Sequence, residues 1–430
     1  MHVIVIGAGI VGTTTALALA ERGLRVTLVE QAGEPATGAS HANGSGITPA
    51  HAEPWNAPGS ARKLLPALLR DDQPWRVRVP ALPGMLAWGF HFLRHSRPKR
   101  YYANTRHCVR LAMYSKRCLL ALRERLALDY HQFTRGSLEL YYSAAEFDHA
   151  IELRRRMEHP EIDMRTLERD ALVALEPALA PVADRFHGAL LFPDHESGDA
   201  RLFSRLMAER AAALGAETLF DTAVNAIVCE RNRFKALATD RGELEADACI
   251  VAAGCGTSSL LAPLGLQVPI YPVKGYSATI GIDADDPAPV MPILDLKRRF
   301  VTARLGPDRL RIAGLAEFAG DNTGIDPKRM QVLLDGAALL LPKLADRIRN
   351  SAPNAWTGLR PMTPDGPPLI GATPIDRLHL NSGHGAMGWT QACGSAELVA
   401  DLVTGNAPAI ATDGLLAERW LNHRARRRRP

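Results

Sequence analysis

The stretch Val3-Ile4-Val5-Ile6-Gly7-Ala8-Gly9-Ile10-Val11-Gly12 decides the fold of the first part of this chain. Its β-branched beginning, Val3–Ile6, is typical of a buried parallel strand, and the Ala- and Leu-rich segment Thr13–Arg22 predicts a helix. A second buried strand is predicted for Val26–Val29, which is followed by Glu30. Strand, glycine turn, helix and strand in this order predict a βαβ unit with the pattern G-x-G-x-x-G at its first turn.

The three glycines of this pattern predict a dinucleotide site. Gly7 permits a tight turn, Gly9 lets a pyrophosphate approach the backbone, and Gly12 allows the helix to pack closely on the strand. The helix N-terminus then offers N–H groups to the phosphates. Glu30 stands 18 residues after Gly12, where a carboxylate accepts hydrogen bonds from ribose hydroxyls and repels a 2′-phosphate. The pattern therefore favours FAD or NAD over NADP.

Length and composition indicate an ordinary globular protein. The chain has 430 residues, enough for two or three domains, with 47% hydrophobic and 23% charged residues. The net charge is +5, and five arginines near the C-terminus account for all of it: Arg424, Arg426, Arg427, Arg428 and Arg429. Since the rest of the chain is neutral overall, we expect a solvated tail and no nucleic-acid partner for the folded surface.

The cysteines and the apolar N-terminus indicate a cytoplasmic protein. Six cysteines occur without any C-x-x-C pair, so no metal site is predicted and reduced, packed thiols are expected. The uncharged stretch His2–Ala20 lacks a basic beginning and is interrupted by glycines. We therefore expect neither a signal peptide nor a membrane-spanning helix there.

The remaining chain alternates helical and β-branched segments. A long loop is predicted from Gly38 to Gly59, and Asp199 is placed to cap a helix over Ala200–Leu214. Near the C-terminus, a short strand, the glycine-rich stretch Gly383–Thr390 and an apolar helix repeat the design of the N-terminus. Further helices are predicted at Leu64–Leu128 and Ala145–Met157, and further strands at Phe133–Ser143, Ala223–Cys229, Ala248–Val251, Tyr271–Ile280 and Leu310–Ala316.

Five stretches together carry a resemblance to a known family. They are Gly7–Gly12 with Glu30, Ser40–Asn43, Tyr271–Ser277, Gly358–Gly366 and Gly383–Thr390. Spread over nearly the whole chain, they resemble the D-amino acid dehydrogenase branch of the D-amino acid oxidase, or glycine oxidase-like, flavoprotein family. The C-terminal pattern G-H-G-x-x-G-W-T-x-A-C-G-S is far more specific than the dinucleotide motif.

The resemblance implies an α/β fold with a discontinuous, GR2-type Rossmann-like FAD-binding domain. This domain would comprise residues 1–60, 185–264 and 356–430. An interleaved α+β substrate domain, which contains an antiparallel sheet, would comprise residues 61–184 and 265–355.

The resemblance also implies which residues hold FAD. The glycine turn would bind the pyrophosphate, the end of the second strand the adenosine ribose, and the loop after it would lie beside phosphate and flavin. Backbone groups farther along would meet the adenine, the dinucleotide and the pyrimidine edge of the flavin, where a helix N-terminus stabilises negative charge. In that order the residues are Gly7, Gly9, Ile10, Val11 and Gly12; Glu30 and Gln31; Ser40, His41, Ala42 and Asn43; Val224; Gly254; and Gly385, Ala386, Met387, Gly388, Trp389 and Thr390.

For the substrate, the resemblance implies an anchor at Arg360. A planar guanidinium makes a bidentate pair with a carboxylate and thereby positions the Cα of an amino acid. Tyr276 is the second candidate, through a hydrogen bond from its hydroxyl to the same carboxylate. His51 is the third, because His51 and Glu53 stand where less ionisable residues are usual in the family.

The implied activity is FAD-dependent oxidative deamination of a D-amino acid to the 2-oxo acid and ammonia through an imino acid. Electrons would pass to an acceptor other than oxygen, such as a membrane quinone, which would bring a cytoplasmic protein to the inner membrane surface. Three alternatives stay open: dehydrogenation or oxidation of D-hydroxyproline or another cyclic or secondary amino acid, tRNA modification, and an FAD-carrying subunit without activity of its own. His51 and Glu53 favour the first alternative. The basic tail favours the second, and the neutral body argues against it.

Overall fold

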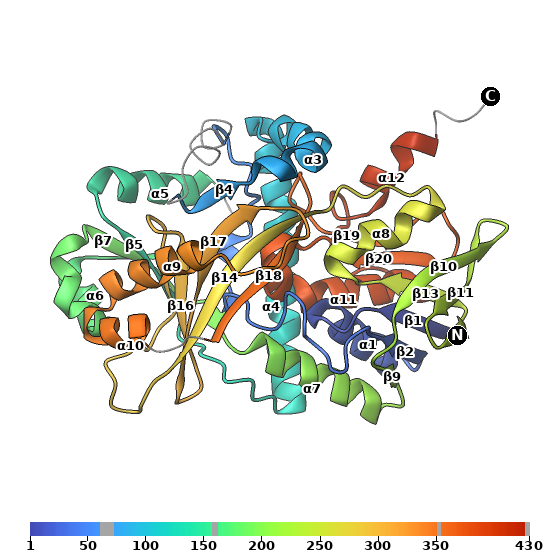
Figure 1. The fold of residues 1–430 in the computed structure, drawn as a ribbon, viewed down its shortest axis with the longest axis horizontal. Helices are drawn as coiled ribbons and strands as arrows, with labels where there is room; N and C mark the ends of the chain where they lie inside the picture. The colour runs from blue at the N-terminus through green and yellow to red at the C-terminus, as the bar shows by residue number, and fades with distance from the viewer. Residues whose placement is uncertain (61–72, 157–161, 351–353, 426–430) are drawn as a thin grey trace.

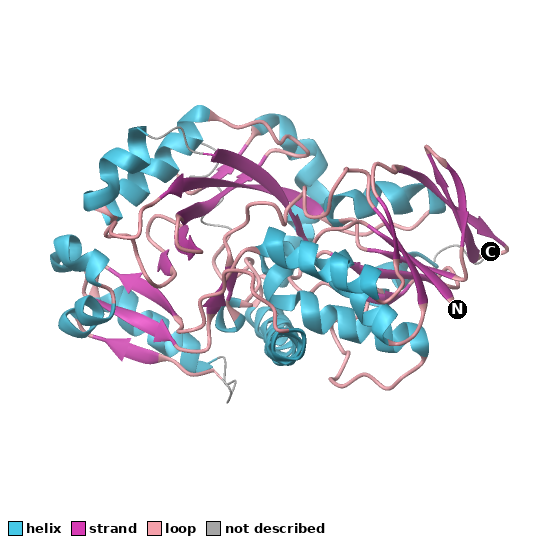
Figure 2. Ribbon diagram, turned by 90° about the horizontal axis from the view of Figure 1, so that it is seen from below, coloured by secondary structure: helices cyan, strands magenta, loops and turns pink. Residues whose placement is uncertain are grey.

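The computed structural model describes residues 1–60, 73–156, 162–350 and 354–425. Two sheet-containing bodies lie side by side, and the long helix α4 (Pro98–Leu126) crosses the middle of the molecule (Figure 1, Figure 2). α4 packs closely on α11 (Gly388–Thr404). The contact is so tight that a Cβ added at Gly394 of α11 would lie only 2.8 Å from the backbone of Ser115 in α4.

The first body contains a six-stranded sheet in the order β19-β20-β13-β1-β2-β9. Neighbouring strands are parallel, except that β19 and β20 are antiparallel. Side chains alternate along a strand, so Val3 and Val5 enter one core while Ile4 and Ile6 enter another. The strands are β1 (His2–Ile6), β2 (Arg25–Val29), β9 (Glu217–Leu219), β13 (Ala248–Val251), β19 (Leu369–Ala372) and β20 (Leu378–Ser382).

Both faces of this sheet are covered. On the side of Val3 and Val5, α1 (Ile10–Glu21) and α7 (Ala200–Ala213) pack beside α11. An antiparallel meander and two helices cover the other side: β10 (Val224–Glu230), β11 (Arg233–Thr239), β12 (Gly242–Glu245), α8 (Thr257–Leu261) and α12 (Glu418–Ala425). Burial on both faces explains why the N-terminal strands are unbroken apolar runs rather than alternating ones.

The second body contains a larger, mostly antiparallel sheet in the order β18-β14-β17-β16-β15-β5-β7-β6, with β4 beside β17. α9 (Pro327–Leu340) and α10 (Ala345–Asn350) bury its apolar core on one face. The strands are β4 (Trp75–Val77), β5 (Ser137–Tyr141), β6 (Arg165–Leu167), β7 (Gly188–Phe192), β14 (Tyr271–Gly281), β15 (Ile293–Asp295), β16 (Phe300–Leu305), β17 (Arg309–Phe318) and β18 (Asn354–Met362). The remaining described helices and strands are short connections, except α3 (Leu82–His95), α5 (Ala144–Arg156) and α6 (Arg169–Leu175).

The predicted N-cap at Asp199 is confirmed. Its Oδ1 accepts the N–H groups of Arg201 and Leu202 at 3.0 and 3.2 Å. The prediction that Leu64–Leu128 is largely helical is confirmed for the described part from Leu82 onward, whereas residues 73–81 are not α-helical. β4, the 3-10 turn Val79–Ala81, α3 and α4 follow one another, because prolines start each new helical segment. Residues 61–72 of that stretch, Met157 of the next predicted helix and Arg426–Arg429 lie outside the described residues.

The structure also shifts two expected domain boundaries. β7 and β18 fall largely in segments 185–264 and 356–430, which we assigned to the FAD-binding domain. Both strands hydrogen-bond within the second sheet instead, β7 with β5 and β6, and β18 with β14. Strand partners are set by tertiary contacts, so the boundaries that the resemblance implied do not coincide with the two sheets at β7 and β18.

The substitution Gly12→Ala tests whether α1 packs closely on the turn that follows β1. A Cβ at Gly12 would lie 1.8 Å from the carbonyl oxygen of Gly7, so Gly12→Ala must displace the helix or the turn. Overpacking of this kind costs about 1 to 3 kcal/mol, and we expect such a loss in the free energy of unfolding, together with weaker retention of FAD. Denaturant unfolding and flavin absorbance measure the two effects.

Gly89→Ala in α3 is the matched control for Gly12→Ala. A Cβ at Gly89 meets nothing within 4 Å, and alanine is the better helix former, so stability should stay equal or rise. A Gly12→Ala protein as stable and as yellow as the wild type would contradict the packing described for the first turn.

Candidate active site

The turn between β1 and α1 forms an open backbone cradle. Gly7 has a φ of +99°, and a Cβ there would lie 2.9 Å from the carbonyl oxygen of Ala252. Gly9 precedes α1 and carries no side chain to cap it, and the N–H of Ile10 donates to Ser40 Oγ at 3.0 Å. A helix N-terminus approached over bare backbone fits a pyrophosphate, so this part of the chain can hold a dinucleotide.

Glu30 is fixed beside this turn. Its Oε2 accepts the N–H of Ala8 at 2.7 Å and its Oε1 the N–H of Ala32 at 3.1 Å. Each carboxylate oxygen keeps a lone pair, which suits the hydroxyls of a ribose. The N–H of Thr222 donates to the carbonyl of Glu30 at 2.9 Å, which brings Val224 at the start of β10 to the same edge. Gln31 is exposed there.

The glycine-rich loop before α11 lies at the junction of the two bodies. Gly385–Met387 forms a 3-10 turn, α11 begins at Gly388, and the side chains over this stretch are partly or fully exposed. A Cβ at Gly385 would lie 2.8 Å from Sδ of Met362, at the end of β18. Backbone N–H groups at the start of α11 therefore stand beside the substrate sheet, as a flavin edge requires.

The side chains of Thr390 and Trp389 both make contacts within the protein. Thr390 Oγ1 accepts the N–H of Thr48 at 3.1 Å and so ties the loop to the segment after β2. The Trp389 side chain is buried among Tyr130 and Phe203, which leaves only its backbone for a cofactor. Gly254, with a φ of +54°, follows β13 and accepts the hydroxyl of Ser382 at 3.2 Å.

The segment Ser40–Asn43 connects the dinucleotide cradle to the second sheet. Ser277 Oγ on β14 donates to the carbonyl of Ala42 at 2.6 Å. Arg311 on β17 donates to the carbonyl of Asn43 at 3.2 Å and to Thr279 Oγ1 at 2.6 Å. Burial lowers the pKa of Arg311 to about 10, so the guanidinium stays charged at neutral pH. It places a positive charge beside the cofactor loop.

Arg360 on β18 is a guanidinium without an acidic partner. Its Nη1 donates to the carbonyl of Leu315 at 3.1 Å, and within the described residues no carboxylate pairs with it. Burial lowers its pKa to about 10, which still leaves it charged at neutral pH. The side chain is partly exposed. A charge in a desolvated position calls for a counter-charge, so this site is suited to an anionic ligand.

Glycines on two strands make room for this guanidinium. Gly275 on β14 lies under it, where a Cβ would meet Nη1 at 2.4 Å. On β18, Gly358 lies under the ring of Trp356, which stacks on His41 with ring centroids 6.1 Å apart. The ring of Trp55 lies 5.5 Å from Cζ of Arg360.

Sequence reasoning missed these aromatic neighbours of Arg360. Glycine inside a strand marks a close approach and is the signal that could have found them. The cation therefore stands among aromatic rings, beside the loop that would hold the flavin.

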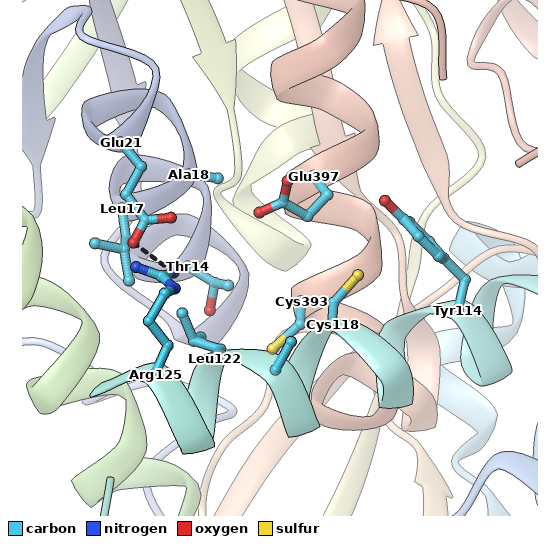
Figure 3. Close-up of a pocket in the computed structure, with 11 residues that line it drawn as sticks. Thr14, Leu17, Ala18, Glu21, Tyr114, Cys118, Leu122, Arg125, Cys393 and Glu397 are labelled. Atoms are coloured by element: carbon cyan, nitrogen blue, oxygen red, sulfur yellow. Dashed lines mark ion pairs between the residues drawn. The ribbon is translucent and has the colours of Figure 1, made fainter. Parts of the chain in front are cut away.

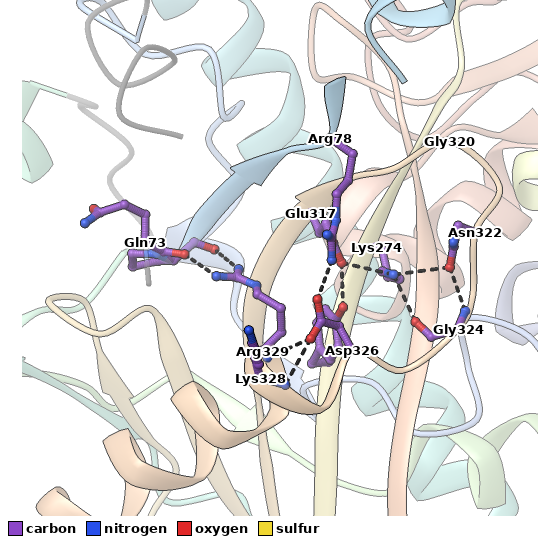
Figure 4. A network of polar contacts seen from close by, with 12 residues as sticks. Gln73, Arg78, Lys274, Glu317, Gly320, Asn322, Gly324, Asp326, Lys328 and Arg329 are labelled. Carbon is purple, nitrogen blue, oxygen red and sulfur yellow. Dashed lines mark hydrogen bonds and ion pairs between the residues drawn. The ribbon is translucent and has the colours of Figure 1, made fainter. Parts of the chain in front are cut away.

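Tyr276 does not join Arg360. In the β14–β18 register, Val273 faces Arg360 and Tyr276 faces Thr357, so the two side chains lie on opposite faces of the sheet. The hydroxyl of Tyr276 donates to the carboxylate of Glu317. Lys274 Nζ lies 3.0 Å from the same carboxylate, and Arg78 forms a further ion pair with it. This geometry does not support the expectation that Tyr276 binds the substrate carboxylate, because alternation along the strand turns its hydroxyl toward Glu317. Figure 4 shows Glu317 in a polar network with its other partners, Lys274 and Arg78.

The carboxylate of Glu317 is the centre of this network. Burial alone would raise the pKa of Glu317, but hydrogen bonds from Tyr276, Lys274 and Arg78 lower it below its ordinary value. Arg78 also pairs with Asp326. Arg78, Lys274 and Asp326 line a cavity of about 860 Å³ on this side of the sheet. Since these cations are paired, they do not compete with Arg360 for an anion.

His51 lies in a second buried cluster. Arg154 donates to its Nδ1 at 2.6 Å, and its Nε2 stands 3.6 Å from Glu139 Oε2. Burial, with Arg154 and His195 as positive neighbours, holds the pKa of His51 well below its ordinary value, so the imidazole is neutral. Arg154 also donates to Glu53 at 3.0 Å. These contacts fix the segment after β3 (Gly46–Ile47) and give His51 no link to Arg360.

A separate cavity of about 240 Å³ lies among the helices (Figure 3). Its lining comes from α1, α4 and α11, and includes Cys118 and Cys393. Burial raises the pKa of Cys118 to about 11, so this thiol is protonated. Within the described chain, no three His, Cys, Asp or Glu side chains are arranged to hold a metal ion. Across the same residues, every helix falls short of the length or apolar character needed to cross a bilayer.

A glycine turn fit for a dinucleotide lies beside a sheet whose Arg360 has no carboxylate partner among the described residues. This combination is typical of flavin-dependent oxidoreductases that act on anionic substrates. The chain belongs to the FAD dependent oxidoreductase family, DAO, whose pattern matches residues 2–402. FAD is the cofactor of this family, and the residues described above fit it.

Relatives of high similarity extend over the whole chain. A protein of Paramagnetospirillum magneticum named D-amino acid dehydrogenase is 42% identical over 424 residues, which cover 98% of this chain and 100% of that protein. A protein of Agrobacterium fabrum with the same name is 38% identical over 420 residues, covering 98% and 100%. The resemblance drawn from the motifs is thereby confirmed.

Solved structures confirm the predicted fold. Glycine oxidase from Geobacillus kaustophilus superposes with a TM-score of 0.74 at 23% identity, covering 97% of this chain and 98% of its own. L-proline dehydrogenase from P. horikoshii also gives a TM-score of 0.74, at 19% identity, covering 99% and 98%. Both superpositions extend over nearly the whole chain, so the two bodies described above share one overall fold with these proteins.

Tyr276→Phe separates a structural role of Tyr276 from a role in substrate binding. The change removes one of three donors to the Glu317 carboxylate, and a hydrogen bond to a charged group contributes about 1.5 to 3 kcal/mol to stability. A depressed carboxyl pKa stabilises the fold above the unfolded pKa of about 4.3 and stops doing so as the pH falls through the folded value. The variant should therefore unfold more easily at pH 7 and lose less stability below about pH 4 than the wild type.

Denaturant unfolding at several pH values measures this effect, and steady-state kinetics supply the second readout. Substrate KM should stay close to wild type, because Tyr276 lies on the face away from Arg360. A normal unfolding curve combined with a raised KM would show that Tyr276 reaches the substrate after all.

Proposed function

We propose that this chain is an FAD-dependent D-amino acid dehydrogenase. It would oxidise the Cα–N bond of a D-amino acid, yielding the 2-oxo acid and ammonia through an imino acid. The observation that carries the proposal is Arg360, a charged guanidinium without an acidic partner in the described chain, beside the loop that would hold the flavin. The names of the relatives from Paramagnetospirillum and Agrobacterium support the same substrate class.

In the proposed reaction Arg360 binds the substrate carboxylate. The guanidinium can present a pair of parallel N–H groups to the two carboxylate oxygens, which orients Cα as well as holding it. Gly275 makes room for the guanidinium, and the ring of Trp55 covers part of it. Desolvation strengthens the ion pair, because the attraction between opposite charges rises as the local dielectric falls.

The cofactor residues have a separate task. Gly7, Gly9, Gly12 and Glu30 would hold the adenosine diphosphate half of FAD, and the start of α11 would face the flavin. Bound FAD supplies the acceptor for the two electrons and the hydrogen that leave Cα. The positive end of α11 and the Arg311 guanidinium favour extra negative charge in this region.

Protons move without a dedicated side-chain base. The substrate amine must lose its proton before Cα is oxidised. Among the described residues, Arg360 contacts the ring of Trp55 and the carbonyl of Leu315, and no carboxylate pairs with it. The imidazole of His41 stacks on Trp356, and burial lowers its pKa. We therefore assign this proton to solvent. Water then adds to the imino acid, and ammonia leaves to give the 2-oxo acid.

We further propose that the electrons pass to an acceptor other than oxygen, of the quinone type, at a membrane surface. The term dehydrogenase in the names of the relatives supports this acceptor class. A membrane quinone would keep the protein in peripheral contact with the bilayer.

Arg360 variants test the carboxylate anchor. Arg360→Lys keeps the charge but loses the fork, and Arg360→Ala loses both. Because a charge-assisted hydrogen bond contributes about 1.5 to 3 kcal/mol, Arg360→Ala should lower kcat/KM about tenfold to a hundredfold or more. FAD content and unfolding should stay near wild type. Stopped-flow flavin reduction compares the best D-amino acid with the matching amine that lacks a carboxylate.

The wild type should strongly prefer the amino acid, and Arg360→Ala should remove most of that preference. Tyr276→Phe is the matched control and should keep it. An Arg360→Ala enzyme that still discriminates between acid and amine would mean that the carboxylate is bound elsewhere.

The acceptor and the substrate class are tested with reduced enzyme. We expect a short-chain ubiquinone to reoxidise the flavin faster than dissolved oxygen does, with little hydrogen peroxide formed. Anaerobic bleaching should be fastest with D-amino acids in a panel that includes glycine, sarcosine and D-hydroxyproline. Fast reoxidation by oxygen with one hydrogen peroxide per turnover would make the protein an oxidase, and preferred bleaching by D-hydroxyproline would make it a cyclic amino acid enzyme.

A further inference from the structure

One helix of the second body presents an apolar face to solvent. On α3, Leu86 is 70% exposed, Phe90 65% and Leu93 38%, and Val79 just before the helix is 66% exposed. Spacings of four and three residues put Leu86, Phe90 and Leu93 on one side of the helix. Soluble surfaces rarely gather several large apolar side chains in one row, so this face, the α3 ridge, is suited to contact with another surface.

The α3 segment itself carries cations and no acid, and Asp365, the carboxylate that acts on His91 and His95 from outside the segment, is paired with Arg419. The sequence from Gln73 to Arg123 contains no Asp or Glu. Arg94, Arg97 and Lys99 follow the ridge at its C-terminal end and are exposed, and within the described residues they form no ion pair. An apolar row with unpaired cations at its end complements a surface that is negative outside and apolar beneath.

The opposite side of α3 is anchored to the active-site strand. Trp88 and Phe92 are buried, and Trp88 Nε1 donates to the carbonyl of Met362 at 2.8 Å. Met362 lies two residues after Arg360, and its sulfur contacts the glycine loop at Gly385. The ridge therefore lies on the outer side of α3, and the inner side of α3 contacts the end of β18, next to the region where substrate and flavin would meet.

The chain end arrives at the same helix. Trp420 of α12 packs on His91 and His95 of α3, with ring centroids 4.9 and 5.8 Å apart. α3 and α12 lie together at the upper edge of Figure 1. Five of the last seven residues in the sequence are arginine: Arg424 belongs to α12, and Arg426–Arg429 lie outside the described residues.

We propose that the α3 ridge, with Arg94, Arg97 and Lys99, docks on the surface of an anionic lipid bilayer. Leu86, Phe90 and Val79 enter the boundary between headgroups and acyl chains, while the cations bind lipid phosphates. Docking by this face brings the flavin side of the protein to the membrane. A functional need for this docking depends on the proposed quinone acceptor. The docking face itself is identified independently, from the exposed apolar side chains of α3 and the cations that follow them.

Vesicle co-sedimentation of the FAD-loaded protein tests the docking. Wild type should bind phosphatidylglycerol-rich vesicles, bind pure phosphatidylcholine vesicles weakly, and lose binding as salt screens the cations. Leu86→Ser/Phe90→Ser should lower the partition coefficient at least about tenfold, because two large side chains no longer enter the bilayer. Arg94→Gln/Arg97→Gln/Lys99→Gln should remove most of the salt dependence. FAD content and turnover with a soluble dye should stay at the wild-type level in both variants.

Leu214→Ser/Leu339→Ser is the matched control, since these leucines are 55% and 46% exposed and lie outside α3. It should bind vesicles as the wild type does. Wild type that does not bind anionic vesicles, or a Leu86→Ser/Phe90→Ser variant that binds equally well, overturns the docking. So does a wild-type dimer that this variant splits into monomers, because the ridge is then a contact between two copies. Failure to oxidise D-amino acids with the dye would instead overturn the proposed function and leave vesicle binding intact.

Discussion

The pairing of β14 with β18 is the constraint on which the candidate site depends. Its register sets Gly275 opposite Gly358 and Val273 opposite Arg360, so the guanidinium lies over a position without a side chain. The same face of β14 carries Ser277, which binds the carbonyl of Ala42 in the cofactor loop. One strand pair therefore sets the position of Arg360 relative to the glycine turn after β1, and a slip of one residue would turn Arg360 to the opposite face of the sheet.

The two faces of this strand pair differ in how their buried charges are compensated. On one face, Glu317 accepts hydrogen bonds or ion pairs from Tyr276, Lys274 and Arg78, and its pKa is lowered despite burial. On the other face Arg360 has a backbone carbonyl and an aromatic ring as neighbours. A fully paired network such as that of Glu317 stabilises the fold, whereas a charge without a counter-charge is suited to a ligand. The two kinds of buried charge lie on opposite faces of the same sheet.

The parts of the site that lie close together in sequence could be predicted, and those that depend on strand faces could not. The glycine turn, Glu30 and the Asp199 cap each follow from a local rule about backbone conformation or hydrogen bonding, and the structure has them as expected. Tyr276 was misplaced because its motif says nothing about which side of β14 meets the flavin loop. His51 was singled out as an ionisable residue, but burial beside Arg154 leaves it neutral.

By itself, the sequence determined that this protein binds a dinucleotide and belongs to the α/β flavoproteins, because unbroken apolar strands, glycine spacing and one acid at the end of a strand act over short distances. Only the tertiary structure decided that Trp55 covers Arg360, that β7 and β18 join the second sheet, and that α3 keeps an apolar face in solvent. These features depend on which segments pack against each other. Burial and long-range strand pairing are properties of the whole chain, and no short stretch encodes them.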